Sequence, residues 1–127
     1  MSSQTKEYAD NYAAAQKSGL SQKEMEIRAF INMASNINKI KEHWEEEQKN
    51  LPDVLEKNRL LWTVIASSMQ EEDCPQPIEI KKNILQLAAF VFKRTLDLIN
   101  QPRPEGLDVL ININMNIARG LGGNAGE

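Results

Sequence analysis

Glycine is scarce in the middle of this chain. Six of the 127 residues are glycine, and none lies between Gly19 and Gly106. Tight turns and β-hairpins use glycine at their positive-φ positions, so such a long stretch without it disfavours a β-sheet protein. The five prolines divide the chain into segments of helical length; they are Pro52, Pro75, Pro77, Pro102 and Pro104. The sequence therefore predicts an all-α protein.

Paired cysteines, long apolar runs and an excess of positive charge are also missing. The single Cys74 cannot form an internal disulfide, and only one histidine is present to activate it as a nucleophile. No apolar run approaches the roughly 20 residues that span a bilayer, and the first residues do not resemble a secretory signal. Fifteen Lys and Arg against eighteen Asp and Glu give a net charge of −3, which argues against direct nucleic-acid binding. We expect a cytoplasmic protein without membrane insertion.

Length and composition indicate one domain over residues 1–127. The chain is 41% hydrophobic and 26% charged, which is typical of a globular protein and not of a disordered one. We expect a single helical bundle of about five helices, at residues 4–17, 22 to beyond 44, 52–70, 77–100 and 105–119.

The two ends of the chain carry weaker signals. Residues 4–17 form a weakly amphipathic segment with Tyr8 and Tyr12 one helical turn apart, followed by Gly19 as a C-terminal cap. Ser21 and Glu24 then have the spacing of a capping box. We expect this first helix to be detachable. Three arrangements stay open: it packs on its own bundle, exchanges with a neighbour, or covers a groove until displaced. Residues 122–127 are expected to form a flexible tail.

The segment 77–100 has the widest apolar face and is therefore placed at the centre of the bundle. Its apolar side chains spread over roughly 200° of a helical wheel; they are Ile80, Ile84, Leu85, Leu87, Ala88, Val91, Phe92, Leu96, Leu98 and Ile99. Phe90 lies apart from them in a polar arc. That position fits either a tolerated exposed side chain or a protein contact.

The segment 105–119 alternates apolar residues and asparagines from Ile111 to Ile117, which matches the period of a strand. A lone strand would have no partner here. Helical projection also gathers Leu107, Leu110 and Leu121 on one face. We therefore predict a helix, ended by a cap at Gly120.

Two asparagines project from apolar faces, Asn58 in 52–70 and Asn114 in 105–119. An unpaired amide buried there would cost about 1–3 kcal/mol, so each needs a partner. They either bond each other or a backbone carbonyl inside the bundle, or they line a groove and bond a docked peptide. Trp62 shares the face of Asn58 and is expected in the core, whereas Leu60 and Val64 point the opposite way and require another helix or a partner.

No constellation of residues indicates catalysis. His43 lies near Glu47 at a helical spacing, but one histidine with carboxylates on a helix end is more typical of a solvated charged face than of a metal site. The chain has no phosphate-binding glycine loop and no nucleophile with a base. We expect no enzyme activity, no cofactor and no metal.

From residue 54 onward the order of landmarks resembles the FlaF family of flagellar biosynthesis regulators. The matching stretches run from Asn58 to Trp62, from the Pro75 and Pro77 break into an apolar helix, and from Leu110 to Asn114. The family usually has an acidic residue at the position of Asn112 and a basic one near Asn116, so charged contacts made there do not carry over.

The resemblance implies a small helical cytoplasmic protein that binds flagellin as a secretion chaperone and acts against the translational repressor FlbT. We expect an apolar groove formed by the segments 52–70, 77–100 and 105–119 to hold an amphipathic segment of flagellin. An alternative is regulation of flagellin synthesis through FlbT or RNA without flagellin binding. The oligomeric state stays open. The candidate partner-binding residues are Asn58, Arg59, Leu60, Trp62, Val64, Phe90 and Asn114.

Overall fold

Four long helices make up most of the described chain. The computed structural model describes residues 21–122, which contain no strand. The long helices are α2 (Gln22–Glu42), α4 (Leu51–Met69), α5 (Ile78–Asn100) and α6 (Asp108–Gly122). Short helices α3 (Trp44–Glu47), η1 (Gln48–Asn50) and η2 (Pro104–Leu107) lie in the connections.

The all-α prediction is therefore confirmed, with four long helices in residues 21–122 in place of about five for the whole chain. The expected helix at 4–17, the cap at Gly19 and residues 123–127 of the expected tail lie outside the described residues.

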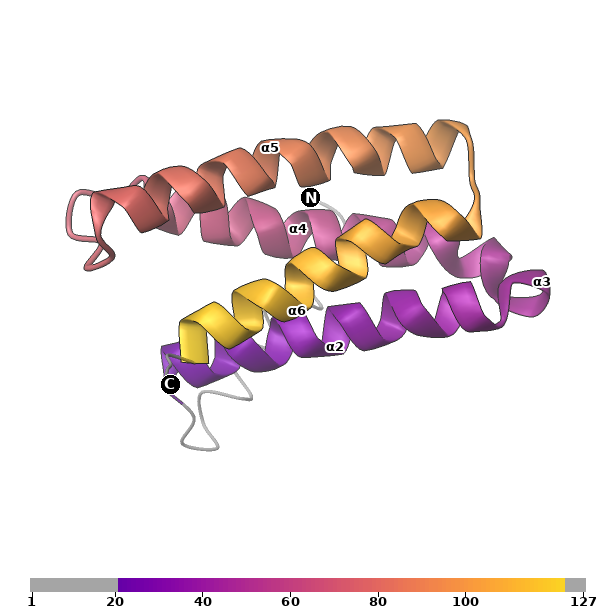
Figure 1. Ribbon diagram of the computed structural model, residues 1–127, viewed down its shortest axis with the longest axis horizontal. Helices are drawn as coiled ribbons and strands as arrows, with labels where there is room; N and C mark the ends of the chain where they lie inside the picture. Colours follow the sequence, from indigo (N-terminus) through magenta and orange to yellow (C-terminus); the bar gives the residue numbers. More distant parts are fainter. Residues whose placement is uncertain (1–20, 123–127) are drawn as a thin grey trace.

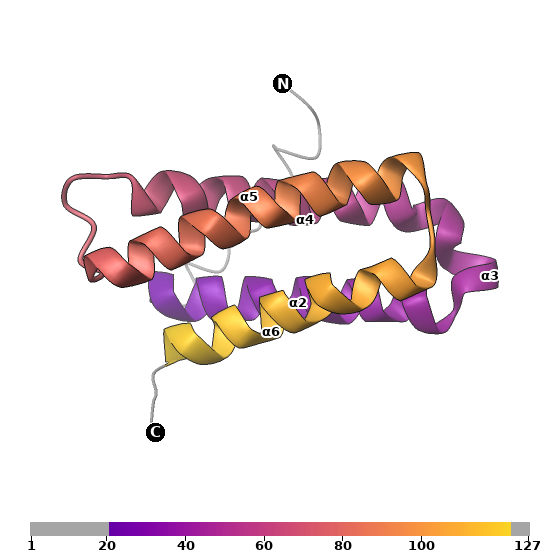
Figure 2. The same cartoon turned by 45° about the horizontal axis from the view of Figure 1, so that its top comes forward.

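Consecutive long helices run in opposite directions (Figure 1). α2 packs along α6 and α4 packs along α5, and the two pairs form two layers (Figure 2). α2 also contacts α4. Apolar side chains from all four long helices form one hydrophobic core between the layers, as expected for helices that each bury one face.

α2 begins at the predicted capping box and ends earlier than predicted. The Ser21 hydroxyl accepts a hydrogen bond from the Glu24 backbone N–H at 3.1 Å, and the Glu24 carboxylate accepts one from the Ser21 N–H at 2.9 Å. The predicted continuation beyond Trp44 is wrong, because the His43 backbone leaves the helical region at φ −120° and ψ 46°. This break lets Trp44 pack against the core while α4 turns back along α2.

α5 is not the central helix of the bundle. α4 contacts both α2 and α5 and forms hydrogen bonds with α6, whereas α5 packs mainly against α4. The predicted central position of segment 77–100 is therefore wrong. α5 buries one face only, because the core of a four-helix bundle has room for about that much of each helix; the buried residues are Ile84, Ala88, Val91, Thr95 and Leu98.

The connection from α5 to α6 depends on a close approach at Gly106. A Cβ atom there would lie 2.6 Å from Cδ2 of Leu98, whose side chain is fully buried, so that hydrogen is the side chain that fits. α6 continues past Gly120, and the predicted cap at that residue is wrong. The helix prediction itself is confirmed.

Candidate functional site

The two asparagines of the apolar faces meet inside the core. The Nδ2 group of Asn114 donates a hydrogen bond to Oδ1 of Asn58 at 2.7 Å, and Nε1 of Trp62 donates to Oδ1 of Asn114 at 2.9 Å. All three side chains are 0% exposed. The interpretation in which the asparagines bond each other is confirmed. A buried polar contact of this kind fixes how two helices align, here α4 and α6.

Trp62 also connects these helices to α2. Its ring meets Phe30 edge to face, with the ring centroids 5.3 Å apart and the planes at 70°, which is a favoured aromatic arrangement. The Nδ2 group of Asn58 has no hydrogen-bond partner within residues 21–122. Because Asn58, Trp62 and Asn114 are fully enclosed, they offer no surface to a partner in this conformation.

Arg59 lies at the surface of α4, but its charge is engaged by its own helix. Nε and Nη2 donate to the two carboxylate oxygens of Glu56 at 2.9 and 2.7 Å. These hydrogen bonds lower the pKa of Glu56 below its usual value. The hydroxyl of Thr63 donates to the Arg59 carbonyl one turn later. A partner carboxylate would have to compete with Glu56 for the guanidinium.

Leu60 and Val64 lie on the outward face of α4, as the helical wheel predicts. They are one turn apart, and neither belongs to the described core or packs against it. Val64 is 42% exposed. They form an apolar pair beside the exposed polar residues Thr63 and Ser67, and apolar side chains on such a face favour contact with another segment.

Most of the exposed large apolar side chains in residues 21–122 lie on α5. They are Ile78, Ile80, Phe90, Leu96 and Ile99, with Ile31 and Val64 on other helices. Residues 78, 85, 89, 92, 96 and 99 recur at intervals of seven, four and three, which places them on one side of the helix. We call this set the α5 stripe: Ile78, Leu85, Ala89, Phe92, Leu96 and Ile99.

The sequence interpretation missed the α5 stripe as a surface because it placed Leu85, Phe92, Leu96 and Ile99 on a central, buried face and did not include Ile78 or Ala89. Leu85 and Phe92 do pack partly against the core, but Ile78 and Leu96 are each 64% exposed. The available signal was the width of the apolar arc. An arc of roughly 200° is wider than one buried helix face requires, so part of it must remain outside.

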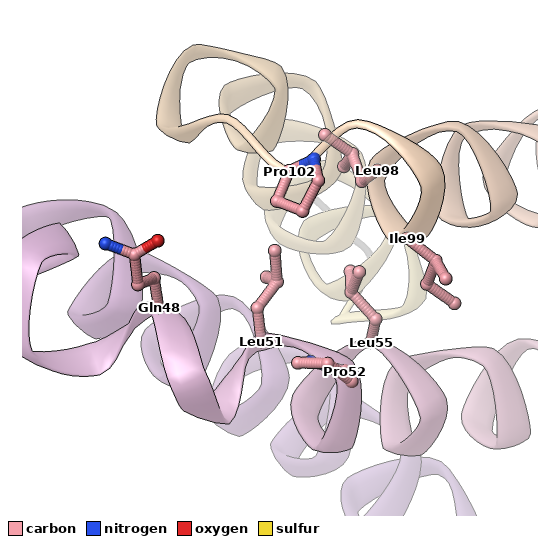
Figure 3. A pocket seen from close by; sticks show the side chains of 7 residues that line it. All are labelled: Gln48, Leu51, Pro52, Leu55, Leu98, Ile99 and Pro102. Atoms are coloured by element: carbon pink, nitrogen blue, oxygen red, sulfur yellow. The ribbon is translucent and has the colours of Figure 1, made fainter.

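The α5 stripe ends beside a small apolar pocket of about 100 Å³ (Figure 3). The lining residues come from η1, the start of α4, the end of α5 and the following loop; they are Gln48, Leu51, Pro52, Leu55, Leu98, Ile99 and Pro102. Cofactor and drug pockets measure roughly 300–1,000 Å³, so this pocket suits a single aliphatic side chain. Ile99, the last residue of the α5 stripe, therefore lies next to α4.

Phe90 occupies the opposite side of α5. It precedes Ile99 by nine residues, which is half a rotation at about 100° per residue. Its ring is 38% exposed and carries the Arg94 guanidinium 5.5 Å from its centroid, a cation–π geometry. The structure therefore does not bring the expected groove residues together: Asn114 is buried, and Phe90 faces away from the helix that carries Leu60 and Val64.

The family match extends over most of this architecture. The family model for Flagellar protein FlaF matches residues 8–121. The chain belongs to the FlaF family. The FlaF match begins ahead of α2, within residues 1–20, and ends in the last turn of α6. No curated protein and no solved structure matches the chain.

Asn112 and Asn116, the α6 positions at which we expected a departure from the FlaF pattern, lie on its surface. Asn112 is exposed, and Oδ1 of Asn116 accepts a hydrogen bond from Nη1 of Arg119 at 2.6 Å. The described part of this FlaF-family chain holds no cluster of three His, Cys, Asp or Glu side chains that could bind a metal ion. Within the same residues, every helix is too short or too polar to cross a membrane.

Proposed function

We propose that this FlaF-family chain is a cytoplasmic secretion chaperone that binds an amphipathic helix of flagellin on the α5 stripe. It acts by binding and not by catalysis. The observation that carries the proposal is the exposure of Ile78 and Leu96, each of which keeps 64% of its surface open. Apolar side chains exposed in a row favour association with another apolar surface.

The spacing of the α5 stripe fits a helical partner. Intervals of four and three residues are those by which one helix packs lengthwise against another. From Ile78 to Ile99 the stripe extends about 32 Å at about 1.5 Å per residue, enough for about six turns of a docked helix. The pocket beside Ile99 then accepts one aliphatic side chain at the end of that helix.

Flagellin is the partner because the FlaF family implies it and because its chemistry is suitable. The terminal segments of flagellin are amphipathic and polymerise when free. Docking one of them on the α5 stripe removes two apolar surfaces from water at once, which is the general basis of helix recognition in a groove or on an apolar face. The same contact keeps the segment from joining other flagellin molecules before export.

Calorimetric titration with monomeric flagellin tests this function. We expect saturable one-to-one binding by wild-type flagellin and none by flagellin that lacks its terminal helices. Binding of the truncated flagellin with unchanged affinity would contradict the terminal helix as the docked segment. No flagellin binding, together with saturable binding of FlbT in the same titration, would overturn the chaperone function and favour the repressor as the direct partner.

A matched pair of variants tests the location of the site. Leu96→Asp places a charge on the α5 stripe, and Ile31→Asp places the same charge on an exposed isoleucine of α2. We expect Leu96→Asp to weaken flagellin binding by about tenfold or more, which is about 1.4 kcal/mol, and Ile31→Asp to change it less than about twofold. Equal effects of the two variants would contradict the α5 stripe as the docking surface.

A further inference from the structure

Two buried polar side-chain atoms lie in the core without a hydrogen-bond partner among residues 21–122. They are Nδ2 of Asn58 on α4 and Oγ1 of Thr95 on α5. Asn58 is 0% exposed and Thr95 is 1% exposed, so neither atom reaches bulk solvent. A buried polar group that stays unpaired costs free energy on folding, and native cores almost always supply a partner. Both atoms therefore indicate a polar contact inside the bundle.

The buried faces of α4 and α5 match layer by layer. The two helices are in contact and run in opposite directions (Figure 1). The buried residues of α4 include Leu55, Asn58, Trp62, Ile65 and Met69, and those of α5 are Leu98, Thr95, Val91, Ala88 and Ile84. Both series follow intervals of three, four, three and four residues. Because the rise per residue is the same in both helices, the two series can pair in order along their whole length.

The pocket at the end of α5 shows which residues start this pairing. Leu55 and Leu98 both line it (Figure 3), so they belong to one level of the bundle. Asn58 lies three residues after Leu55, and Thr95 lies three residues before Leu98. In antiparallel helices these steps move both positions by about 4.5 Å in the same direction. Asn58 and Thr95 therefore form the next layer of the core, and their two unpaired atoms belong to the same layer.

The chemistry of the two atoms fits a bridging water molecule. Oδ1 of Asn58 accepts a hydrogen bond from Asn114, so the amide cannot turn over without losing that bond, and Nδ2 stays a donor. The Thr95 hydroxyl can donate or accept, but neither atom forms a direct hydrogen bond. Water can accept from the amide and bond the hydroxyl at the same time. Buried water molecules typically pair such groups, and two polar partners are the least that they need.

We propose that Asn58 and Thr95 form a binding site for one buried water molecule, which accepts a hydrogen bond from Nδ2 of Asn58 and bonds Oγ1 of Thr95. The polar contact between α4 and α6 thereby extends to α5. A continuous network then runs from Trp62 through Asn114 and Asn58 to the water and Thr95. The proposal does not depend on which client binds.

The water site also favours the observed register of α5 on α4. A shift of α5 by one turn would place Asn58 opposite Val91 or Leu98, and neither side chain offers a polar atom. A buried polar contact of this kind selects one alignment of two helices over its neighbours. The register of α5 determines in turn where the α5 stripe lies on the bundle.

A high-resolution crystal structure of the wild-type chain tests the site directly. We expect one ordered water at about 2.7–3.2 Å from both Nδ2 of Asn58 and Oγ1 of Thr95. A direct hydrogen bond between these two atoms, with no water between them, would overturn the proposal. A hydrogen bond from Oγ1 to the carbonyl of Val91, one turn earlier in the same helix, would overturn it as well if no water contacts Asn58.

The sign of the stability change in Thr95→Val supplies a second test. Valine keeps the shape of the side chain and removes the hydroxyl, so the water loses a partner. We expect the equilibrium constant of unfolding, measured by chemical denaturation, to rise about five- to tenfold. Thr63→Val makes the same exchange on an exposed threonine of α4 and should change it less than about threefold. Unchanged or increased stability of Thr95→Val would overturn the proposal, because removing a hydroxyl that has no partner favours folding.

A double-mutant cycle with Asn58→Leu tests whether the two residues act together. In the Asn58→Leu background the water has already lost its donor, so we expect Thr95→Val to change the equilibrium constant less than about threefold. Thr95→Ser keeps the hydroxyl and should keep the water in a crystal structure, whereas Thr95→Val should lose it. An equal effect of Thr95→Val in both backgrounds would show that Thr95 acts without Asn58 and would overturn the shared site.

Discussion

α4 and α5 are amphipathic helices of similar length, yet they bury their apolar residues very differently. α4 encloses Trp62 and Asn58 completely and leaves Val64 as its one large apolar side chain classed as exposed, whereas α5 exposes five. The difference arises from neighbours and not from composition, because α4 lies between α2 and α5 while α5 packs mainly on α4. An apolar helix at the edge of a bundle therefore combines a structural face with a second face available for binding.

The largest expected effect on stability concerns the enclosed side chains of α4. Asn114→Leu removes the acceptor of Trp62 and the donor to Asn58, leaving two buried polar groups without partners. We expect the free energy of unfolding to fall by about 3 kcal/mol, measured by chemical denaturation.

The double variant Asn58→Leu with Asn114→Leu is the control. It removes both amides and leaves only the Trp62 N–H unpaired, so we expect it to be more stable than the sum of the single variants predicts. Strict additivity of the two changes would contradict a coupled network between α4 and α6.

The next largest effect concerns the junction where the edge helix joins α6. Gly106→Ala places a methyl group against the buried Leu98, and we expect it to lower the free energy of unfolding by about 1–3 kcal/mol through overpacking. Gly120→Ala is the matched control, because no atom lies within 4 Å of its Cβ position inside α6. It should stabilise the protein by about 0.5–1 kcal/mol. Thermal unfolding of both variants measures the contrast, and equal shifts would contradict the close approach at Gly106.

A smaller effect on stability is expected at the start of α2. The enclosed core requires α2 to keep its register. Ser21→Ala removes the side-chain cap, and we expect a loss of about 1 kcal/mol in the free energy of unfolding. Hydrogen bonding by the Ser21 backbone N–H and side chain lowers the pKa of Glu24 below its usual value of 4.5. The ionised Glu24 carboxylate therefore stabilises the folded chain above about pH 4.5, and this stabilisation is lost as the pH falls through the lowered pKa. Wild type should therefore lose more stability than Glu24→Gln between pH 6 and pH 3, and parallel denaturation curves would contradict this role.

The smallest expected effect on stability concerns the exposed surface of α5. Phe90 contacts Arg94 but lies outside both the core and the α5 stripe. We expect Phe90→Ala to cost about 0.5–1 kcal/mol, the size of an exposed cation–π contact, measured by urea denaturation, and to weaken flagellin binding less than Leu96→Asp does. A loss above about 2 kcal/mol would show that Phe90 belongs to the packed interior.

The fold was predictable to the extent that its signals are local. The capping box at Ser21 and the prolines at 52 and 77 mark helix ends through the backbone of neighbouring residues, and these ends agree with the structure within about one residue. The break at His43 was not predictable in this way. The apolar pattern continues to Trp44, and the helix ends there because Trp44 packs on a core formed by distant segments.

The candidate site was predictable only in part, because burial depends on which helices are adjacent. The sequence shows that Asn58 and Asn114 need partners, but their pairing requires α4 and α6 to lie side by side at one register. The same limitation hid the α5 stripe. Leu96 and Leu98 are equally apolar in the sequence, yet one is 64% exposed and the other is fully buried.

The pairing of α2 with α6 determines when this chain can fold during its synthesis. α2 is the first of the described helices to leave the ribosome and α6 is the last, and each is the other's most extensive neighbour. α4 and α5 can associate as a hairpin beforehand, but Trp62 has no acceptor until Asn114 has been translated. The core of residues 21–122 therefore stays incomplete until α6 emerges, and we expect it to close cooperatively then. We expect chains that terminate before Asp108 to be more sensitive to proteases, because their core is incomplete.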